Sequence, residues 1–408
     1  MPAASWKRNL FFLWIAQFFS IMGFSFGLPF APFYIQSLGI SEPAQIKMWT
    51  AAFAAAPALT FMIFAPLWGS ASDKFGRKIM LLRSYIGGAI VLTLLGLAGN
   101  VWQLIALRLF QGMLTGSVTA AQTLVSANTP TEKSGFAIGS LSAMIYIGNM
   151  AGNSIGGYFA DAFGYRYAFI VSGLILFLPV ILVSLFVKEN FTAVEGASIW
   201  PSKENISGSI SKLSIALPVL AVIFVAGFCV FFDSGMFPLL VQEIHGKLEG
   251  ASLRTGSINA VAGLGGIAGS MLVSYLSDKF APSKIAVVAA ILAGFAMLPQ
   301  AFATTLGTVM LFRFCMVMCS TSLDPIFQVW LTKVTPKNIR GMVFGFASTA
   351  RSFGWFSAPL LSGLLASVYG IRFLYIAGIF NYIILAIVII FVIKKFGTIR
   401  KPVAARGS

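Results

Sequence analysis

The 408-residue chain is 58% hydrophobic and only 10% charged, and it contains 40 Gly and 39 Phe. Because a soluble domain is about half apolar and about a quarter charged, this composition excludes an ordinary set of soluble domains. A helix of about twenty apolar residues crosses the ~30 Å hydrocarbon core of a bilayer, so the chain has room for about twelve such helices. The composition therefore predicts a protein that crosses the membrane many times.

The net charge of +16 does not indicate a nucleic-acid partner, because the basic residues lie in short clusters between apolar runs. Cys229, Cys315 and Cys319 fall inside apolar runs, which predicts neither a disulfide framework nor a zinc site. The single histidine, His245, lies in a predicted loop. We therefore expect no metal and no cofactor. The first apolar run is too long for the core of a cleavable signal peptide, so none is expected.

Two sets of six apolar runs are separated by one long polar stretch. The runs cover residues 9–36, 48–71, 79–98, 102–127, 135–160, 165–187, 214–240, 255–276, 285–304, 306–332, 341–367 and 371–393. None alternates like a barrel strand, so each is predicted to be a spanning helix. We expect an all-α membrane protein with an N-terminal six-helix bundle at 1–187, a cytoplasmic linker at 188–212, and a C-terminal six-helix bundle with a short cytoplasmic tail at 213–408.

The distribution of Lys and Arg between alternate loops predicts the orientation in the membrane. If the N-terminus is cytoplasmic, the cytoplasmic segments carry 20 basic residues and the outer loops carry five. The outer five are Lys47, Arg166, Lys247, Arg254 and Arg372. Since cytoplasmic loops are enriched in basic residues, both termini are predicted to be cytoplasmic.

Short motifs recur in the two halves at an offset of 205 or 206 residues. The pairs are Ser72–Phe75 with Ser277–Phe280, Arg108 with Arg313, Thr129-Pro130 with Thr335-Pro336, and Phe163–Arg166 with Tyr369–Arg372. An even number of helices in each half gives both copies the same orientation. The sequence therefore predicts two parallel repeats about an axis normal to the membrane, with a substrate site between them at the midplane.

Three motifs carry a family resemblance. They are Gly69-Ser-Ala-Ser-Asp73-Lys-Phe-Gly76-Arg77-Lys78 after the second run, Leu107-Arg108-Leu-Phe-Gln111-Gly112 in the fourth, and Gly148-x3-Gly152-Asn153-x2-Gly156-Gly157 in the fifth. Together they resemble the major facilitator superfamily over essentially the whole chain. The pairs Leu28-Pro29 and Ala31-Pro32 are most similar to its twelve-helix drug:proton antiporter branch. The resemblance implies a monomeric transporter, not an enzyme, with twelve transmembrane helices in two pseudo-symmetric bundles.

The loop after the second run is expected to close the cytoplasmic side. Gly76 permits a tight turn, and the Asp73 carboxylate suits a helix N-terminus, where backbone amides and the helix dipole favour an anion. The resemblance implies that this helix is the one that begins near Gly341. Alternatively, the loop is a solvated charged segment that only sets the topology. The gating prediction covers Gly69, Asp73, Gly76, Arg77, Lys78 and Asp278.

Five ionisable side chains lie inside predicted spans: Arg108, Arg313, Arg351, Asp233 and Asp324. Charge within a membrane is costly, so they are expected to face a wet cavity or one another; Arg108 and Arg313 could instead extend toward the interface. Asp233 and Asp324 are the candidate proton carriers, because burial raises the pKa of a carboxylate toward neutrality. The alternative is that each forms a permanent ion pair with an arginine.

In the fifth run, Gly148, Gly152 and Gly156 lie four residues apart. Gly265 and Gly269 in the eighth run have the same spacing. Such small faces allow close helix contact, so the two stripes are expected to pack across the halves; alternatively, glycine is merely common in membrane helices. Asn153 stands where the family motif has proline. The predicted packing residues are Gly148, Gly152, Asn153, Gly156 and Gly157.

The predicted substrate cavity is lined by Gln17, Arg108, Gln111, Gln328, Arg313 and Arg351. Three intramembrane arginines against two carboxylates favour an anionic or zwitterionic substrate. The predicted function is proton-coupled efflux of amphiphilic small molecules by alternating access in a bacterial-type cytoplasmic (inner) membrane, with protons, a small-molecule substrate and lipid as partners. The alternatives are a dedicated carrier of one organic anion, such as a carboxylate siderophore or a phosphorylated compound, and a lipid flippase.

Overall fold

The computed structural model describes residues 3–130, 133–189, 191, 217–321, 323, 326–327, 330–331, 335 and 340–396. Within these residues all regular elements are helices, as the apolar runs predicted. Most of the predicted linker and the tail beyond residue 396 lie outside the described residues, so the boundaries of the linker stay a prediction.

The N-terminal half contains six long helical segments, two of them broken. The first consists of α1 (Ala3–Gly27), the single 3₁₀ turn η1 (Leu28–Phe30) and α2 (Ala31–Ser37), and the fourth of α5 (Val101–Leu114) and α6 (Ser117–Asn128). The unbroken ones are α3 (Pro43–Phe75), α4 (Arg77–Leu97), α7 (Ser134–Phe163) and α8 (Tyr165–Phe186). The first break follows from Pro29 and Pro32, which lack the amide hydrogen that a continuous helix needs.

The C-terminal half repeats this plan. Its seventh segment is broken between α10 (Leu217–Phe231) and α11 (Phe237–His245), and the others are α12 (Ala251–Lys279), α13 (Pro282–Ala301), α14 (Leu306–Ser320), α16 (Arg340–Tyr369) and α17 (Ile371–Phe396). The repeat extends to helix caps. The Asn100 side chain accepts the Gln103 amide hydrogen at the start of α5, and Thr305, 205 residues later, accepts that of Thr308 at the start of α14.

Eight helical segments among the described residues are long and apolar enough to cross a membrane, and α10 and α14 are apolar but shorter. The helices α7 and α16 are not among the eight. Each of them packs against the other half of the protein, α7 against α12 and α16 against α3.

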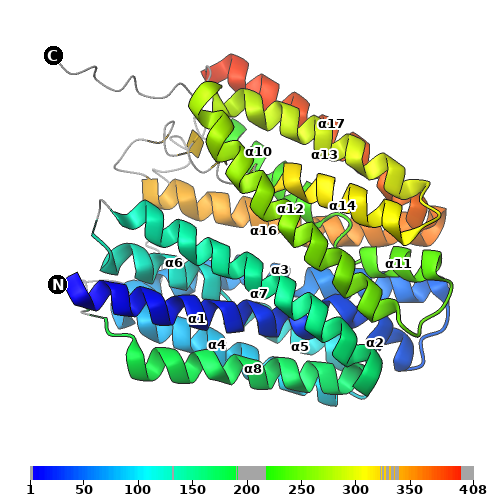
Figure 1. Ribbon diagram of the computed structural model, residues 1–408, viewed down its shortest axis with the longest axis horizontal. Helices are drawn as coiled ribbons and strands as arrows, with labels where there is room; N and C mark the ends of the chain where they lie inside the picture. Colours follow the sequence, from blue (N-terminus) through cyan, green and yellow to red (C-terminus); the bar gives the residue numbers. More distant parts are fainter. Residues whose placement is uncertain are drawn as a thin grey trace.

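Figure 1 shows the two halves as two layers of helices, with α3, α7, α12 and α16 along the seam between them. The start of α1 and the end of α17 lie at the same end of the molecule. We call this the inner end, following the predicted topology, and the opposite one the outer end. The outer end carries the turns at Gly39, Gly164, Gly246 and Gly370.

The halves are packed together at the outer end, whereas two glycines nearer the inner end face open space among the described residues. In the outer part, a Cβ atom on Gly363 of α16 would collide with Ala51 of α3, and one on Gly256 of α12 would collide with the Asn153 carbonyl of α7. Toward the inner end, a Cβ on Gly69 of α3 or Gly345 of α16 has no atom within 4 Å. The structure is therefore closed at its outer end.

Candidate functional site

A buried ion pair occupies the core of the C-terminal half. Asp233 lies in the break between α10 and α11, where its backbone carbonyl accepts the amide hydrogens of Met236 (3.0 Å) and Phe237 (2.9 Å). Its carboxylate is 1% exposed and pairs with Arg313 of α14. The guanidinium also lies 4.2 Å from the centroid of the Phe237 ring. The Asp233 side chain thus meets an arginine of its own half, which is the ion-pair alternative that the sequence left open.

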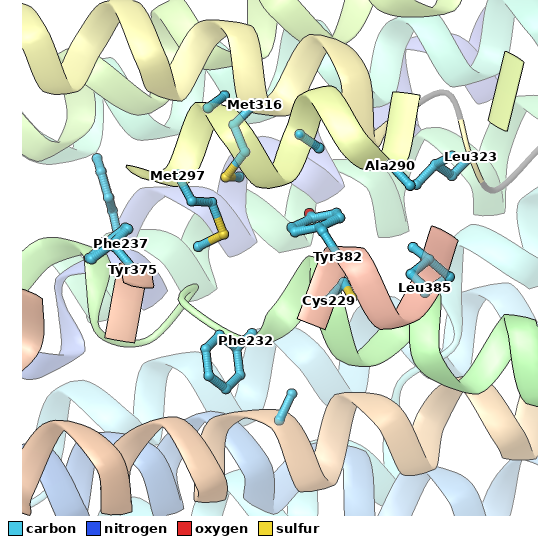
Figure 2. Close-up of a cluster of buried hydrophobic side chains, with 14 of the residues drawn as sticks. Cys229, Phe232, Phe237, Ala290, Met297, Met316, Leu323, Tyr375, Tyr382 and Leu385 are labelled. Carbon is cyan, nitrogen blue, oxygen red and sulfur yellow. The ribbon is translucent and has the colours of Figure 1, made fainter. Parts of the chain in front are cut away.

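The surroundings of this pair are largely apolar, with Gln300 and two tyrosines among the buried polar side chains nearby. Figure 2 shows part of the buried hydrophobic cluster of this half, with Phe232, Phe237, Met297, Met316, Tyr375 and Tyr382 among its members. The hydroxyls of Tyr375 and Tyr382, together with Nε of Arg313, have no hydrogen-bond partner among the described residues. Removing one charge of a buried pair leaves the other uncompensated, at a cost of about 3–5 kcal/mol. The contact between the two charges therefore stabilises the core of the C-terminal half.

Arg108, the repeat counterpart of Arg313, has different partners. Its Nε donates to the Phe53 carbonyl (3.0 Å), Nη1 donates to Oε1 of Gln111, and the guanidinium lies 4.5 Å from the centroid of the Phe53 ring. All of these groups are neutral, and the side chain is buried. The N-terminal half therefore holds a buried positive charge without a carboxylate among its described contacts.

Gln17 lies in α1 and accepts a hydrogen bond from the Tyr85 hydroxyl of α4 at 3.1 Å. Both side chains are buried within the N-terminal half, and Nε2 of Gln17 has no partner among the described residues. The described contacts do not bring Gln17, Arg108 and Arg313 into one site. The shared cavity predicted from the sequence therefore stays a prediction.

Two predicted site residues, Asp324 and Gln328, lie outside the described residues. Arg351 is described; it is half-buried on α16 and lies against Gly227 of α10. Asp324 remains a candidate proton carrier on the basis of the sequence alone.

The tight turn predicted at Gly76 is present. This glycine has φ +94° and is the single residue between α3 and α4. The Glu189 carboxylate accepts the amide hydrogens of Arg77 (3.1 Å) and Lys78 (2.8 Å) at the start of α4, where the helix dipole favours an anion. Sequence analysis missed Glu189 because it falls in the predicted linker. The side chains of Asp73 and Asp278 lie outside the described residues, so the gating role of the loop stays a prediction.

The glycine stripes were expected to pack across the halves, and this expectation is wrong. Gly148, Gly152 and Gly156 lie against the backbone of α1, at Phe18, Met22 and Phe26 respectively. The stripe in α12 packs within the C-terminal half: Gly265 and Gly269 lie against Phe314 and Met318 of α14. Glycines spaced four residues apart form a face of small residues. In each half, a neighbouring helix of the same bundle packs against this face.

The contact between α7 and α12 is formed by Asn153 and Gly157, which the sequence did place at the seam. A Cβ on Gly157 would collide with the Ser252 carbonyl, and Oδ1 of Asn153 accepts a hydrogen bond from Asn259 at 3.4 Å. Asn153 also donates to Oδ1 of Asn149, 2.9 Å away. The residue that replaces the proline of the family motif thus forms a polar contact between the halves.

Further contacts join the halves at the outer end, and sequence analysis predicted none of those that follow. The amides of Gln36 and Gln242 hydrogen-bond to each other, and Nζ of Lys47 donates to the Ala366 carbonyl (3.0 Å). Oδ2 of Asp161, near the end of α7, accepts the Leu253 amide hydrogen in the first turn of α12 (2.8 Å). Gln36 and Gln242 are 206 residues apart, so extending the repeat would have identified them as equivalent.

A shallow apolar groove of about 510 Å³ lies along α10 and α16, and Met62 of α3 is the one residue of the N-terminal half that lines it. Phe224 and Phe353 stack there with their ring centroids 5.5 Å apart, and Phe231 and Trp355 form a second contact farther along the same two helices (4.8 Å). Aromatic walls with few polar groups are typical of sites for organic molecules.

Comparisons with known proteins agree with this architecture. The sequence profile of the Major Facilitator Superfamily matches residues 13–249 and 223–407. The chain is 31% identical to multidrug resistance protein MdtG of Salmonella schwarzengrund over 90% of this chain and 91% of that protein. It is 32% identical to the protein of the same name from Enterobacter lignolyticus over 90% of this chain and 88% of that one.

Solved structures show the same fold at low sequence identity. A bacterial homologue of the human lysosomal transporter Spinster, in an inward-facing and occupied conformation, has a TM-score of 0.74 at 16% identity, with 97% of this chain and 98% of that one covered. The nucleoside transporter NupG has a TM-score of 0.75 at 13% identity, with 94% and 99% covered. The predicted fold and the predicted absence of enzymatic function both agree with this kinship. The chain belongs to the Major Facilitator Superfamily and is a multi-pass membrane transporter.

Proposed function

We propose that the protein exports amphiphilic small molecules from the cytoplasm across a bacterial-type inner membrane in exchange for protons. The observation that carries this proposal is the similarity to multidrug resistance proteins over nine-tenths of the chain. The apolar, aromatic groove along α10 and α16 supports an amphiphilic substrate. The protein functions as a monomer with both termini in the cytoplasm.

The two halves alternate between this outer-closed state and one closed at the inner end. Two observations support the outer-closed state. The helix pairs α3–α16 and α7–α12 are in close contact in their outer parts, and there is open space around Gly69 and Gly345. In the second state, the loop at Gly76 closes the inner end. The substrate site is then exposed to one side of the membrane at a time.

Asp233 is the proton carrier in this proposal. Protonation removes the carboxylate charge, so the buried Arg313 loses its only described ionic partner. Since an unpaired buried charge is unstable, α14 must then shift relative to the break between α10 and α11, where Asp233 lies. The ion pair therefore couples proton binding to a change in packing within the C-terminal half.

Arg108 sets the charge preference for the substrate. Its described partners are neutral, so an anionic group on the substrate would supply the missing countercharge. This supports zwitterionic and anionic amphiphiles as better substrates than simple cations.

The test uses purified protein in liposomes with an imposed pH gradient. Three amphiphiles of similar size, one anionic, one zwitterionic and one cationic, are followed by fluorescence. We expect gradient-dependent transport that a protonophore abolishes and that Asp233→Asn uncouples, whereas Glu249→Gln, a change at an exposed outer carboxylate, leaves it intact. Transport that persists unchanged without a gradient would contradict proton coupling. Transport of one anion alone would favour a dedicated carrier.

A further inference from the structure

Gln36 and Gln242 form a reciprocal amide pair across the seam. Nε2 of Gln36 donates to Oε1 of Gln242 at 2.9 Å, and Nε2 of Gln242 donates to Oε1 of Gln36 at 3.0 Å. Each side chain thus gives and receives one hydrogen bond. Both are half-buried, so water competes only partly for these groups.

The pair is a contact between equivalent positions of the two repeats. Gln36 and Gln242 are 206 residues apart, and so are Pro32 and Pro238, which each occupy the second position of a short outer helix. Each glutamine lies four residues after its proline. A contact in which a residue meets its own counterpart is self-complementary, as at a two-fold interface. It therefore lies on the pseudo-two-fold axis that relates the halves.

The position on this axis matters for transport. A path between two halves related by such an axis runs along it, so a contact on the axis blocks the path. Outside the pair, a groove of about 440 Å³ is lined by both halves, including Lys47 and Ile46 from one and Glu243 and Ile371 from the other. Both glutamines line this groove.

We propose that Gln36 and Gln242 are the outer gate of the transport path; this role rests on the alternating access proposed above. Two neutral amides are suited to a gate that must open in every cycle. Once separated, each can exchange its partner for water at small net cost. The contact also carries no net charge, so its opening does not depend on titration of either residue.

The first measurement is the distance between spin labels on the two halves, in liposomes without substrate or pH gradient. The native thiols are removed by Cys229→Ala, Cys315→Ala and Cys319→Ala. Labels at Glu42→Cys and Glu249→Cys report on the outer end, and labels at Ser126→Cys and Lys284→Cys report on the inner end; all four positions are exposed.

We expect Gln36→Ala to lower the ratio of outer-closed to outer-open protein about tenfold, the size expected for the loss of one or two neutral hydrogen bonds. Gln242→Ala should have the same effect, and the double variant should add little, because either single change removes both bonds. Gln45→Ala, at an exposed glutamine near the outer end of α3, is the matched control and should match the parent protein. Unchanged outer distances in Gln36→Ala, or effects that add fully in the double variant, would overturn the proposal.

A charge swap gives a second, independent test. Gln36→Glu with Gln242→Glu places like charges opposite each other and should open the outer end further than the alanine pair does. Gln36→Glu with Gln242→Lys should restore closure. A like-charged pair that remains closed would also overturn the gate. If the outer distances respond as expected but no substrate is ever exported, the gate stands and the proposed export function falls. If the inner and outer distances never change in opposite directions, alternating access itself is wrong.

Discussion

Asp233 neutralises Arg313 in the core of the C-terminal half, whereas Arg108, the counterpart of Arg313 in the N-terminal repeat, contacts only neutral groups in the described structure. The two repeats thus place an arginine at the same position of equivalent helices and use it differently. In the proposed mechanism, a proton breaks the charge pair of one half, and an anionic ligand supplies the countercharge in the other. Energy coupling and substrate charge are then proposed to belong to different halves.

The ion pair should be strongly cooperative. Asp233→Asn leaves Arg313 buried without its carboxylate, so we expect the free energy of unfolding in detergent to fall by about 3–5 kcal/mol. Arg313→Gln should cost a similar amount. The double variant Asp233→Asn with Arg313→Gln should be destabilised by much less than the sum, because no uncompensated charge remains. Thermal unfolding followed by tryptophan fluorescence measures all three variants, and additive losses would show that the two residues act independently.

The glycine stripe of α7 should be required for the N-terminal half to fold. A Cβ on Gly152 would meet the Met22 carbonyl and the Ser25 Cβ of α1, so Gly152→Leu should separate these helices. Overpacking costs about 1–3 kcal/mol or more, and we expect a lower melting temperature and loss of monodisperse protein. Gly139→Leu on the same helix is the control, since a Cβ there has no atom within 4 Å. An equal decrease in melting temperature in both variants would contradict the assignment of this face to α1.

The architecture could be predicted because it depends on run lengths, loop charges and the internal repeat. The twelve apolar runs, the turn at Gly76 and the equivalence of Arg108 and Arg313 all follow from spacing along the chain. Spacing does not reveal which neighbouring helix packs against a given helix face. A stripe at every fourth residue shows that one side of α7 is small, but both α1 and α12 lie beside that helix, and only the fold decides between them.

The same limit applies to the ions and the outer contacts. Asp233 lies in the break after α10, so the direction of its side chain cannot be extrapolated from the helical pattern that precedes it. Gln36 and Gln242 are polar residues near helix ends, where glutamine is unremarkable. Their equivalence is visible in the 206-residue offset, but equivalent positions of two repeats need not touch each other. The contact itself therefore leaves no signal in the sequence.

Asp161 should stabilise the first turn of α12 from the opposite half. Its carboxylate accepts the Leu253 amide hydrogen (2.8 Å), at a helix end where an anion is favoured. We expect Asp161→Ala to increase hydrogen–deuterium exchange about 2- to 30-fold in a peptide covering residues 249–256, since a lost cap costs about 0.5–2 kcal/mol. Asp161→Asn, which keeps an acceptor oxygen, should have a smaller effect. Glu249→Ala is the control, and unchanged exchange in Asp161→Ala would show that the contact contributes nothing in solution.

Arg108 should control discrimination between anionic and cationic amphiphiles. A charged hydrogen bond contributes about 1.5–3 kcal/mol, so Arg108→Gln should reduce kcat/KM for the anionic member of a matched pair by about 10- to 100-fold. For the cationic member, kcat/KM should fall little or rise, because a repulsive charge has been removed. Arg108→Lys keeps the charge but loses the planar fork that contacts both Gln111 and the Phe53 carbonyl, so its effect should be intermediate.

Initial rates in liposomes give the ratio of kcat/KM for the two substrates, which cancels differences in protein amount. Lys247→Gln, which removes an exposed outer charge, controls for a general surface effect. A ratio that changes equally in Arg108→Gln and Lys247→Gln would place the selectivity in long-range attraction at the surface and not at Arg108.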